Sequence, residues 1–497
     1  MSERLGNRNL WCFSLGSIGR DMAASGLFMG HLMNYALFTK TLTAVQFSAL
    51  TAIMVIARVF DALNDPVMGG ILDATRTRWG KFKPWLCSGM ILTIIVILVS
   101  FANSLQGWSY VALFGLMYFA FSISFTMNDI SYWGMLPALA SEPNDRNKLM
   151  AVTNIMCGIA GFLCGIIVPV FTAGDQALGG SAVNAYAILA VLFCAIMLVT
   201  QLITIIGVKE NSALEKAKPF KVSAKGIIGI IKNNDQVVWC GILLLIHFFV
   251  YMITSSISAV YIYLSFGYQG AYASIFTVSS MVAASFVIFL FTPIAKRFGR
   301  KTLARFGTLS SATGSLIMLA CGLFAPQGLK FPLIAASNAI IGFGNVFYLV
   351  MLVNIANCVE YNEYLHGARN EGVIFSVRAF VSKLGMAIGQ FVSMLFCLAI
   401  GVLSFTNKIS SLENDASKGL ITAAEKAVAI EEAASFAPSG SAAALLCFLS
   451  LVPAVCMISA YLIYRKKIVL SEERYDEILE ELKKRKEQDG AAQTVSS

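Results

Sequence analysis

The sequence predicts an all-α membrane protein in which about twelve helices cross the bilayer. Hydrophobic residues fill 57% of the 497 positions, charged residues fill only 13%, and the mean hydropathy is +0.72. Apolar stretches of roughly 20 residues recur along the chain, and each is long enough to cross about 30 Å of hydrocarbon as a helix. Backbone groups inside a bilayer have no water partner, and the stretches lack the alternation of barrel strands, so helices are the expected spanning elements.

The spans are predicted from apolar runs that lie between clusters of charged and turn residues. They lie near residues 11–38, 45–71, 85–104, 109–135, 149–172, 184–208, 235–265, 271–294, 302–324, 331–358, 370–402 and 441–465. A polar stretch at 209–226 divides them into six and six. The predicted organisation is a six-helix bundle at 1–208, a central cytoplasmic linker at 209–234, a second six-helix bundle at 235–465 and a cytoplasmic tail at 466–497.

The loops predict the orientation of the chain. With both termini placed in the cytoplasm, most of the 37 Lys and Arg residues fall in cytoplasmic segments, as the positive-inside rule requires. The net charge of +9 is therefore attributed to contact with anionic lipid, and no nucleic acid is expected as a partner. The long outer loop near 405–440 is polar and rich in Ala, and a short amphipathic helix is predicted at 423–434. The tail is predicted to be an amphipathic helix because Glu precedes Lys at helical spacing.

Eight charged residues lie inside the predicted spans and away from their ends. Each would cost about 2.5 to 3.5 kcal/mol at a helix centre if it faced lipid. Their signs balance, which predicts a shared polar cavity between helices, although structural ion pairs between helices are the alternative. The acids are Asp21, Asp61, Asp65 and Asp129, and the bases are Arg20, Arg58, Arg378 and Lys383.

The second span carries a pattern typical of a cation site. Arg58, Asp61 and Asp65 recur at i, i+3 and i+7 and so share one helix face, with Asn64 close by. Two carboxylates one turn apart repel each other unless a cation or a proton lies between them, and hard cations prefer oxygen ligands. The alternative is that Arg58 permanently neutralises one carboxylate. Thr126 in the fourth span is a further oxygen ligand by this hypothesis.

The fourth and eleventh spans carry candidate substrate contacts. Thr126, Asp129 and Trp133 again follow i, i+3 and i+7, so the Asp129 carboxylate can accept hydrogen bonds from sugar hydroxyls while the Trp133 ring packs on the apolar face of a pyranose. In the eleventh span, Arg378 and Lys383 point in directions that differ by about 140°, so they are expected to have different partners.

Several segments together resemble one known family. They are RVFDALNDPVMGGILDATRTRWGKFKPW from Arg58, GRD at 19–21, NDISYW at 128–133, VEYNEYLHGARNEG at 359–372 and the region of Lys383. They are similar to the glycoside-pentoside-hexuronide:cation symporters, the melibiose carrier group of the major facilitator superfamily, and the similarity covers nearly the whole chain. The resemblance implies twelve helices in two bundles, with a sugar and a monovalent cation, Na⁺ or H⁺, bound near mid-membrane where the bundles meet.

The resemblance also implies roles for individual residues. Arg378 stands where the melibiose carriers have an uncharged amide, and Asn154 replaces a basic residue that helps them hold a galactoside. This difference favours an anionic glycoside such as a hexuronide over melibiose; the alternative is that Arg378 simply pairs with an acid of the cluster. The implied cation ligands are Asp61, Asp65 and Thr126, the sugar contacts are Asp21, Asp129, Trp133 and Tyr348, Lys383 lies near the cation carboxylates, and Arg20 lines the same cavity.

The expected mechanism is alternating access, in which two bundles rock about the occupied site. Charged residues beside the basic loop after the second span are predicted to close an inner gate, unless they are ordinary loop charges. These gate residues are Glu360, Glu363, Arg369 and Glu371.

Two other functions compete with sugar symport. The first is a lipid or amphiphile transporter on the same fold, which would require an apolar cavity; the second is a membrane sensor that binds solute without moving it. An enzyme is not expected, because the sequence, with only three His residues, shows no metal-ligand cluster or nucleophile-base pair. We expect a monomer in the cell inner membrane, with no cofactor beyond the coupling ion and with a sugar or glycoside, a monovalent cation and membrane lipid as partners.

Overall fold

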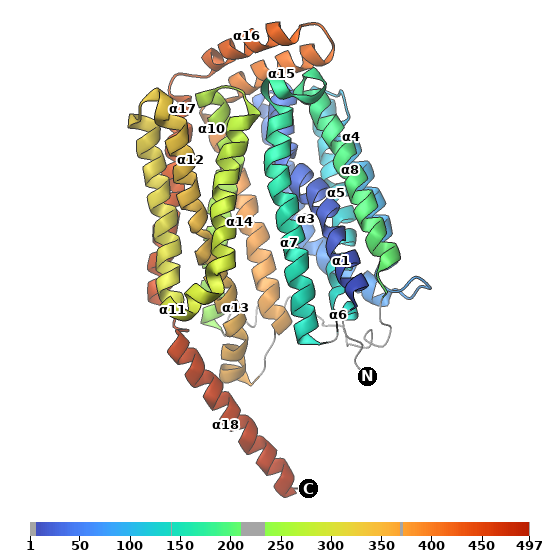
Figure 1. Ribbon diagram of the computed structural model, residues 1–497, viewed down its shortest axis with the longest axis vertical. Coiled ribbons are helices and arrows are strands. Elements are labelled where there is room, and N and C mark those ends of the chain that lie inside the picture. The colour runs from blue at the N-terminus through green and yellow to red at the C-terminus, as the bar shows by residue number, and fades with distance from the viewer. Residues whose placement is uncertain (1–5, 141, 210–233, 368–370, 497) are drawn as a thin grey trace. The chain divides into compact units, whose positions relative to one another are not determined.

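The chain folds into helices joined by turns in the computed structural model, which describes residues 6–140, 142–209, 234–367 and 371–496 (Figure 1). No strand occurs in these ranges. The predicted all-α class is therefore confirmed. The chain forms two compact units, and each unit consists of stretches that are separated in the sequence. Unit 1 comprises Met1–Pro219, Ser258–Val278 and Met394–Ala442, and unit 2 comprises Phe220–Ile257, Ser279–Ser393 and Ala443–Ser497. The bundle boundaries predicted from sequence order stay a prediction.

Eleven helical stretches within the described residues are long and apolar enough to cross a membrane, and each falls on one of the predicted spans. They are Ala44–Asp61, Lys83–Phe101, Gly107–Leu139, Asn144–Thr172, Ala182–Gly207, Asp235–Phe266, Gly270–Phe291, Arg297–Phe324, Gln327–His366, Val373–Ala399 and Ser441–Lys467. The first predicted span is helical too, but it is divided into α1 (Asn7–Arg20), the π-helix η1 (Asp21–Met29) and α2 (Gly30–Thr39).

Unit 1 is built from α1 to α8 with additions from later in the chain. Its helices pack closely where a small residue meets a neighbouring backbone. On α4, a Cβ added to Gly89 would lie 2.6 Å from the backbone nitrogen of Asn128, so α4 and α5 touch at the α5 turn that carries Asp129. The elements after α2 are α3 (Ala44–Ala74), α4 (Lys83–Phe101), α5 (Gly107–Gly134), α6 (Leu136–Leu139), α7 (Pro143–Thr172), η2 (Gly174–Gln176), η3 (Leu178–Gly180) and α8 (Ala182–Gly207).

Unit 2 contains most of the later helices around an apolar core that includes Leu243, Phe347 and Met457. The α11 helix is interrupted at Gly299, whose φ of 72° is a conformation that residues other than Gly rarely adopt. The tail is helical, as predicted. The elements are α10 (Asp235–Phe266), α11 (Gly270–Phe324), α12 (Gln327–Phe343), α13 (Asn345–His366), α14 (Glu371–Ala399), α17 (Ser441–Lys467) and α18 (Glu472–Ser496), and the unit boundaries pass through α10, α11, α14 and α17.

The predicted loop near 405–440 is mostly helical. It contains α15 (Leu403–Ser417), α16 (Ala423–Ala433) and the short 3₁₀ helix η5 (Ala434–Phe436), which we call together the cap (Figure 1, top). The α16 helix agrees with the predicted helix at 423–434 and begins with a capping box at Thr422. The α15 helix was not predicted. All of the cap belongs to unit 1.

Candidate functional site

A buried arginine holds two carboxylates together in unit 1. The Arg20 side chain is 4% exposed, and its Nε donates to Asp21 Oδ1 at 2.9 Å, while its NH1 donates to Asp129 Oδ1 at 3.0 Å. Asp21 begins η1 and Asp129 lies on α5, so the guanidinium joins two separate helical segments. Charge-assisted hydrogen bonds of this kind are strong and fix geometry. The structure therefore brings the predicted Arg20, Asp21 and Asp129 into one cluster.

Aromatic rings cover the same guanidinium. The Arg20 Cζ atom lies 4.5 Å from the centre of the Tyr132 ring and 5.3 Å from that of Trp133. Trp133, predicted as a substrate contact, thus joins the Arg20 cluster from α5. The Asp129 side chain is 39% exposed although one of its oxygens is bound to Arg20. The cluster therefore keeps an accessible carboxylate beside an indole ring, a combination suited to a sugar's hydroxyl groups and apolar face.

The α5 turn that carries Asp129 is fixed from a second side. Asn128 is fully buried, its Nδ2 donates to Gln201 Oε1 on α8 at 2.8 Å, and Gln201 Nε2 donates back to Asn128 Oδ1 at 3.0 Å. A reciprocal amide pair satisfies both side chains and allows little rotation of α5. Asp129 is thus positioned by α4 and α8 before any ligand arrives.

Carboxylates on α3 face hydroxyl groups on α5. Thr126 Oγ1 donates to Asp65 Oδ1 at 3.1 Å, and Ser122 Oγ donates to Asp61 Oδ1. Asp61 and Asp65 are one turn apart on α3, and Ser122 and Thr126 are one turn apart on α5, so each acid meets one hydroxyl. This arrangement offers carboxylate and hydroxyl oxygens, the ligand type that hard cations prefer.

Two further predicted residues belong to the same group. Arg58 NH1 lies 3.4 Å from Asp61 Oδ2, which is the contact that the alternative hypothesis required. Asn64 Nδ2 lies 3.5 Å from the backbone oxygen of Ser122, a long contact that points the amide toward α5. Arg58 therefore contacts Asp61 in this structure.

Ser122 is the residue of this group that the sequence reasoning missed. It precedes Thr126 by four residues, so the helical period alone places the two hydroxyls on one face of α5. A search for hydroxyl residues one turn from Thr126 would have found it. The same helix connects the two clusters, because Thr126 and Asp129 are three residues apart, about 4.5 Å along the helix axis.

Unit 2 contains a separate group around Arg378 on α14. Its NH2 donates to the hydroxyl of Tyr348 on α13 at 3.1 Å, and the His247 ring of α10 stacks on the Tyr348 ring with centroids 5.2 Å apart and an interplanar angle of 11°. Arg378 and Tyr348, both predicted, are thus brought together, whereas His247 was not predicted. Lys383 lies on α14 in unit 2, and its predicted proximity to the acids of unit 1 stays a prediction.

The predicted gate residues lie at the end of α13 and the start of α14. Glu360 and Glu363 are half-buried on the last two turns of α13, and Glu371 is exposed as the first residue of α14. Arg369 lies outside the described residues. Pairing of these groups with the basic loop after the second span stays a prediction.

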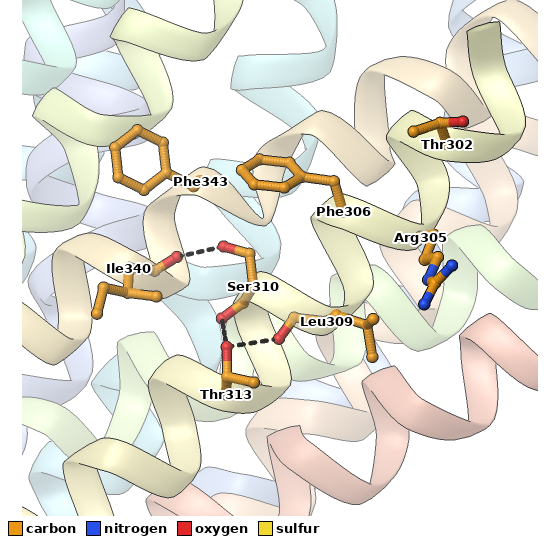
Figure 2. A pocket seen from close by; sticks show the side chains of 8 residues that line it. All are labelled: Thr302, Arg305, Phe306, Leu309, Ser310, Thr313, Ile340 and Phe343. Atoms are coloured by element: carbon orange, nitrogen blue, oxygen red, sulfur yellow. Dashed lines mark hydrogen bonds between the residues drawn. The ribbon is translucent and has the colours of Figure 1, made fainter. Parts of the chain in front are cut away.

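A surface groove of about 550 Å³ lies on unit 2 between α11 and α12 (Figure 2). Two of its hydroxyl groups bond to backbone carbonyls: Ser310 Oγ donates to Ile340 O at 2.8 Å, and Thr313 Oγ1 donates to Leu309 O at 2.7 Å. The other lining residues are Thr302, Arg305, Phe306 and Phe343, so none of the predicted site residues lines the groove. A mostly apolar groove with satisfied hydroxyls does not suit a polyhydroxylated substrate.

The fold and these buried polar clusters define a multi-pass membrane protein with a polar interior, as solute transporters have. Residues 12–468 match the family model described as MFS/sugar transport protein. The chain therefore belongs to the MFS/sugar transport protein family. The prediction of a transporter rather than an enzyme is confirmed, and so is sugar transport at the level of this family.

The relatives are named for sugars and glycosides. The lactose permease of Lactobacillus delbrueckii subsp. bulgaricus is 26% identical over 95% of this chain and 71% of its own length. The glucuronide carrier protein homolog of Escherichia coli strain K12 is 27% identical over 78% of this chain and 83% of its own. The isoprimeverose transporter of Lactiplantibacillus pentosus is 26% identical over 77% of this chain and 79% of its own. These relatives confirm the resemblance to the glycoside-pentoside-hexuronide:cation symporters.

A solved structure shows the same fold at low identity. The D-xylose-proton symporter aligns over 87% of this chain and 98% of its own with a TM-score of 0.55 and 15% identity. A bacterial homolog of the lysosomal transporter Spinster, in an inward-facing conformation, aligns over 93% of this chain and 97% of its own with a TM-score of 0.59 and 13% identity. The fold is therefore that of the major facilitator superfamily, as predicted.

Proposed function

We propose that this protein is a cation-coupled symporter that carries a glycoside into the cytoplasm by alternating access. The observation that supports this most directly is the presence of two polar clusters on neighbouring turns of α5: one has the oxygens that a cation needs, and the other has the groups that a sugar needs. The names of the relatives support the substrate class, because they include carriers of lactose, raffinose, isoprimeverose and glucuronide.

In this proposal the cation binds between Asp61 and Asp65. Its charge offsets the repulsion of the two carboxylates, and the hydroxyls of Ser122 and Thr126 turn their lone pairs toward it. Arg58 contacts Asp61 in the described state and acts as its countercharge when no cation is bound. Either Na⁺ or H⁺ serves as the coupling ion in this scheme.

The sugar binds at the Arg20 cluster. Asp21 and Asp129 accept hydrogen bonds from hydroxyl groups, Trp133 covers the apolar face of the ring, and Arg20 holds both carboxylates in position. The residues proposed to bind the cation and those proposed to bind the sugar share α5. A shift of α5 on cation binding therefore also moves Asp129. Coupling is reciprocal, so the sugar must tighten cation binding by the same factor as the cation tightens sugar binding.

Arg378 in unit 2 gives the substrate its charge preference in this proposal. A guanidinium has five N–H donors, and the Tyr348 hydroxyl accepts from only one of them. The remaining donors suit a carboxylate, which arginine binds with two parallel hydrogen bonds. We therefore propose an anionic glycoside, such as a hexuronide, in preference to a neutral disaccharide.

We propose that both termini lie in the cytoplasm and that the membrane is the cell inner membrane, because this orientation satisfies the positive-inside rule. A monomer is proposed as well. The rival function, transport of a lipid or amphiphile, requires an apolar cavity, and the buried charges of unit 1 favour a hydrophilic ligand instead.

One experiment tests both substrate and coupling ion. Purified protein in proteoliposomes is supplied with neutral and anionic glycosides under separate Na⁺ and proton gradients. We expect accumulation of an anionic glycoside with at least one of the two gradients. Accumulation of amphiphiles only, or glycoside uptake that depends on neither the Na⁺ gradient nor the proton gradient, would contradict the proposal.

A further inference from the structure

The cap follows α14 in sequence, but it belongs to unit 1, and its α15 helix packs on α2 and α8, which come from the first half of the sequence. The outer loop that the cap forms is long, and the transport mechanism outlined above gives it no role. Its polar contacts with the rest of unit 1 raise the question of what they do during transport.

The first contact is a buried ion pair. The side chains of Glu413 and Lys426 are 0% and 3% exposed, and Lys426 Nζ lies 3.4 Å from both carboxylate oxygens. Both groups also bond to backbone where η3 ends and α8 begins: Ala182 N donates to Glu413 Oε2 at 2.6 Å, and Lys426 Nζ donates to Gly180 O at 2.9 Å. Burial raises the pKa of Glu413, whereas the ammonium of Lys426 opposes that rise. Separating the cap from α8 would therefore leave the buried Glu413 and Lys426 side chains without their backbone partners Ala182 and Gly180.

The second contact joins the cap, through amide side chains, to the end of α2, to the connection between α2 and α3, and to Gln106 directly before α5. Asn407 Oδ1 accepts from Leu42 N at 2.9 Å, and its Nδ2 donates to Leu42 O at 2.8 Å. Asn414 Nδ2 donates to Thr39 O at 2.7 Å, and Gln106 Nε2 donates to Asn414 Oδ1 at 3.1 Å. The cap thus bonds the Thr39 carbonyl at the end of α2, a group that helix geometry leaves without an intrahelical partner, and both backbone groups of Leu42.

A glycine in the left-handed conformation lies at each end of the cap. Gly401, between α14 and α15, has a φ of 73°, and Gly440, directly before α17, has a φ of 88°. Residues with a Cβ rarely adopt these angles, whereas Gly passes through them and their mirror images readily. The end of α14 from Met394 and the first two residues of α17 still belong to unit 1, and the rest of both helices belongs to unit 2. The two glycines therefore lie near the points at which the chain passes from one unit to the other.

We propose that the cap stays attached to unit 1 throughout the transport cycle and that Gly401 and Gly440 act as hinges while α14 and α17 move. This inference rests on the alternating access proposed above. Releasing the cap would require the ion pair and the amide contacts to break together in each cycle. Turning two glycines breaks none of them, so the hinge movement is the less costly route.

Cross-linking tests whether the cap stays attached. A Gln106→Cys/Asn414→Cys double variant is treated in proteoliposomes with a short bifunctional thiol reagent, and each single variant with the same reagent is the control. We expect the uptake rate of the cross-linked protein to remain within about twofold of the untreated double variant. A cross-link that reduces uptake more than tenfold, with the single variants unaffected, would show that the cap must detach. Absence of uptake in the unmodified protein would instead refute the proposed function.

Matched glycine variants test the hinges. Gly440 and Gly419 both have positive φ, and an added Cβ would meet no atom within 4 Å at either position, but Gly419 lies within the cap, between α15 and α16. Gly440→Ala is expected to lower kcat at least fivefold with KM unchanged, whereas Gly419→Ala changes neither. Equal kcat for the two variants, at equal amounts of folded protein, would overturn the hinge assignment.

Discussion

The two units bind the charged side chains of their membrane-spanning helices in different ways. In unit 1, Arg20 bridges two carboxylates, and hydroxyls on α5 contact two more. In unit 2, a guanidinium bonds to the phenol of Tyr348, whose ring is stacked on His247. Unit 1 therefore offers mainly acceptors, and the group in unit 2 offers a donor. This contrast makes unit 1 the candidate for binding the cation and the sugar hydroxyls, and makes Arg378 of unit 2 the candidate for recognising a negative charge.

The largest expected effect comes from removing a cation carboxylate. Asp61→Cys removes a negatively charged carboxylate and its ligand oxygens from the predicted cation site, so cation-driven accumulation of glycoside should be abolished. Insertion and folding should persist, because the partner Arg58 is not fully enclosed. Accumulation is measured against a gradient in proteoliposomes, with size-exclusion chromatography as the control for folding. Accumulation at the unmodified level would show that Asp61 is not part of the cation site.

The next effect tests the acceptor cluster of unit 1. Arg20→Gln leaves Asp21 and Asp129 without their shared cation, and breaking a buried charge cluster costs about 3 to 5 kcal/mol. We expect a lower Tm and at least a tenfold loss of glycoside binding. Arg20→Lys, which keeps the charge but not the two-sided geometry, should recover part of the Tm and less of the binding. Unchanged binding in Arg20→Gln would remove this cluster from the sugar site.

A smaller and selective effect is expected in unit 2. Arg378→Gln should weaken uptake of anionic glycosides about tenfold, or about 1.4 kcal/mol, and leave neutral glycosides within twofold. Competition uptake with matched neutral and anionic sugars measures this selectivity. If neutral uptake is unaffected and the unmodified protein takes up no anionic sugar, the idea that unit 2 selects by charge is lost.

The smallest effect concerns the hydroxyl that the sequence reasoning missed. A hydrogen bond or ligand of this type is worth about 0.5 to 1.5 kcal/mol, so Ser122→Ala should raise the half-saturating concentration of the coupling cation about two- to tenfold. Thr126→Ala should have a similar effect, because its hydroxyl meets the other acid. Sugar KM at a saturating concentration of that cation should not change for either variant. An unchanged dependence on the coupling cation in Ser122→Ala alone would exclude Ser122 from the site.

The spans and the charge clusters were predictable because each depends on local pattern. Length and hydropathy indicate a membrane helix, and an acid that recurs at helical spacing indicates a shared face, as with Asp61 and Asp65. Contacts between distant segments were not predictable in this way. Asn407 bonds to the backbone of Leu42, 365 positions earlier, and no periodicity in either segment indicates the pairing. His247 was missed for the same reason, since a single aromatic residue in a span has no distinguishing neighbours.

The π-helix at Asp21–Met29 has a consequence for how insertions and deletions are tolerated. A π-helical turn bonds each N–H five residues back, so it accommodates one residue more than an α-helical turn. The segment therefore absorbs an extra residue while α1 and α2 keep their orientation. Deleting one residue from it would favour a continuous α-helix with both flanks nearly in place, whereas deleting one residue within α1 or α2 would rotate one flank by about 100° relative to the other. A one-residue deletion at Asp21–Met29 should therefore be better tolerated than the same deletion within α1 or α2.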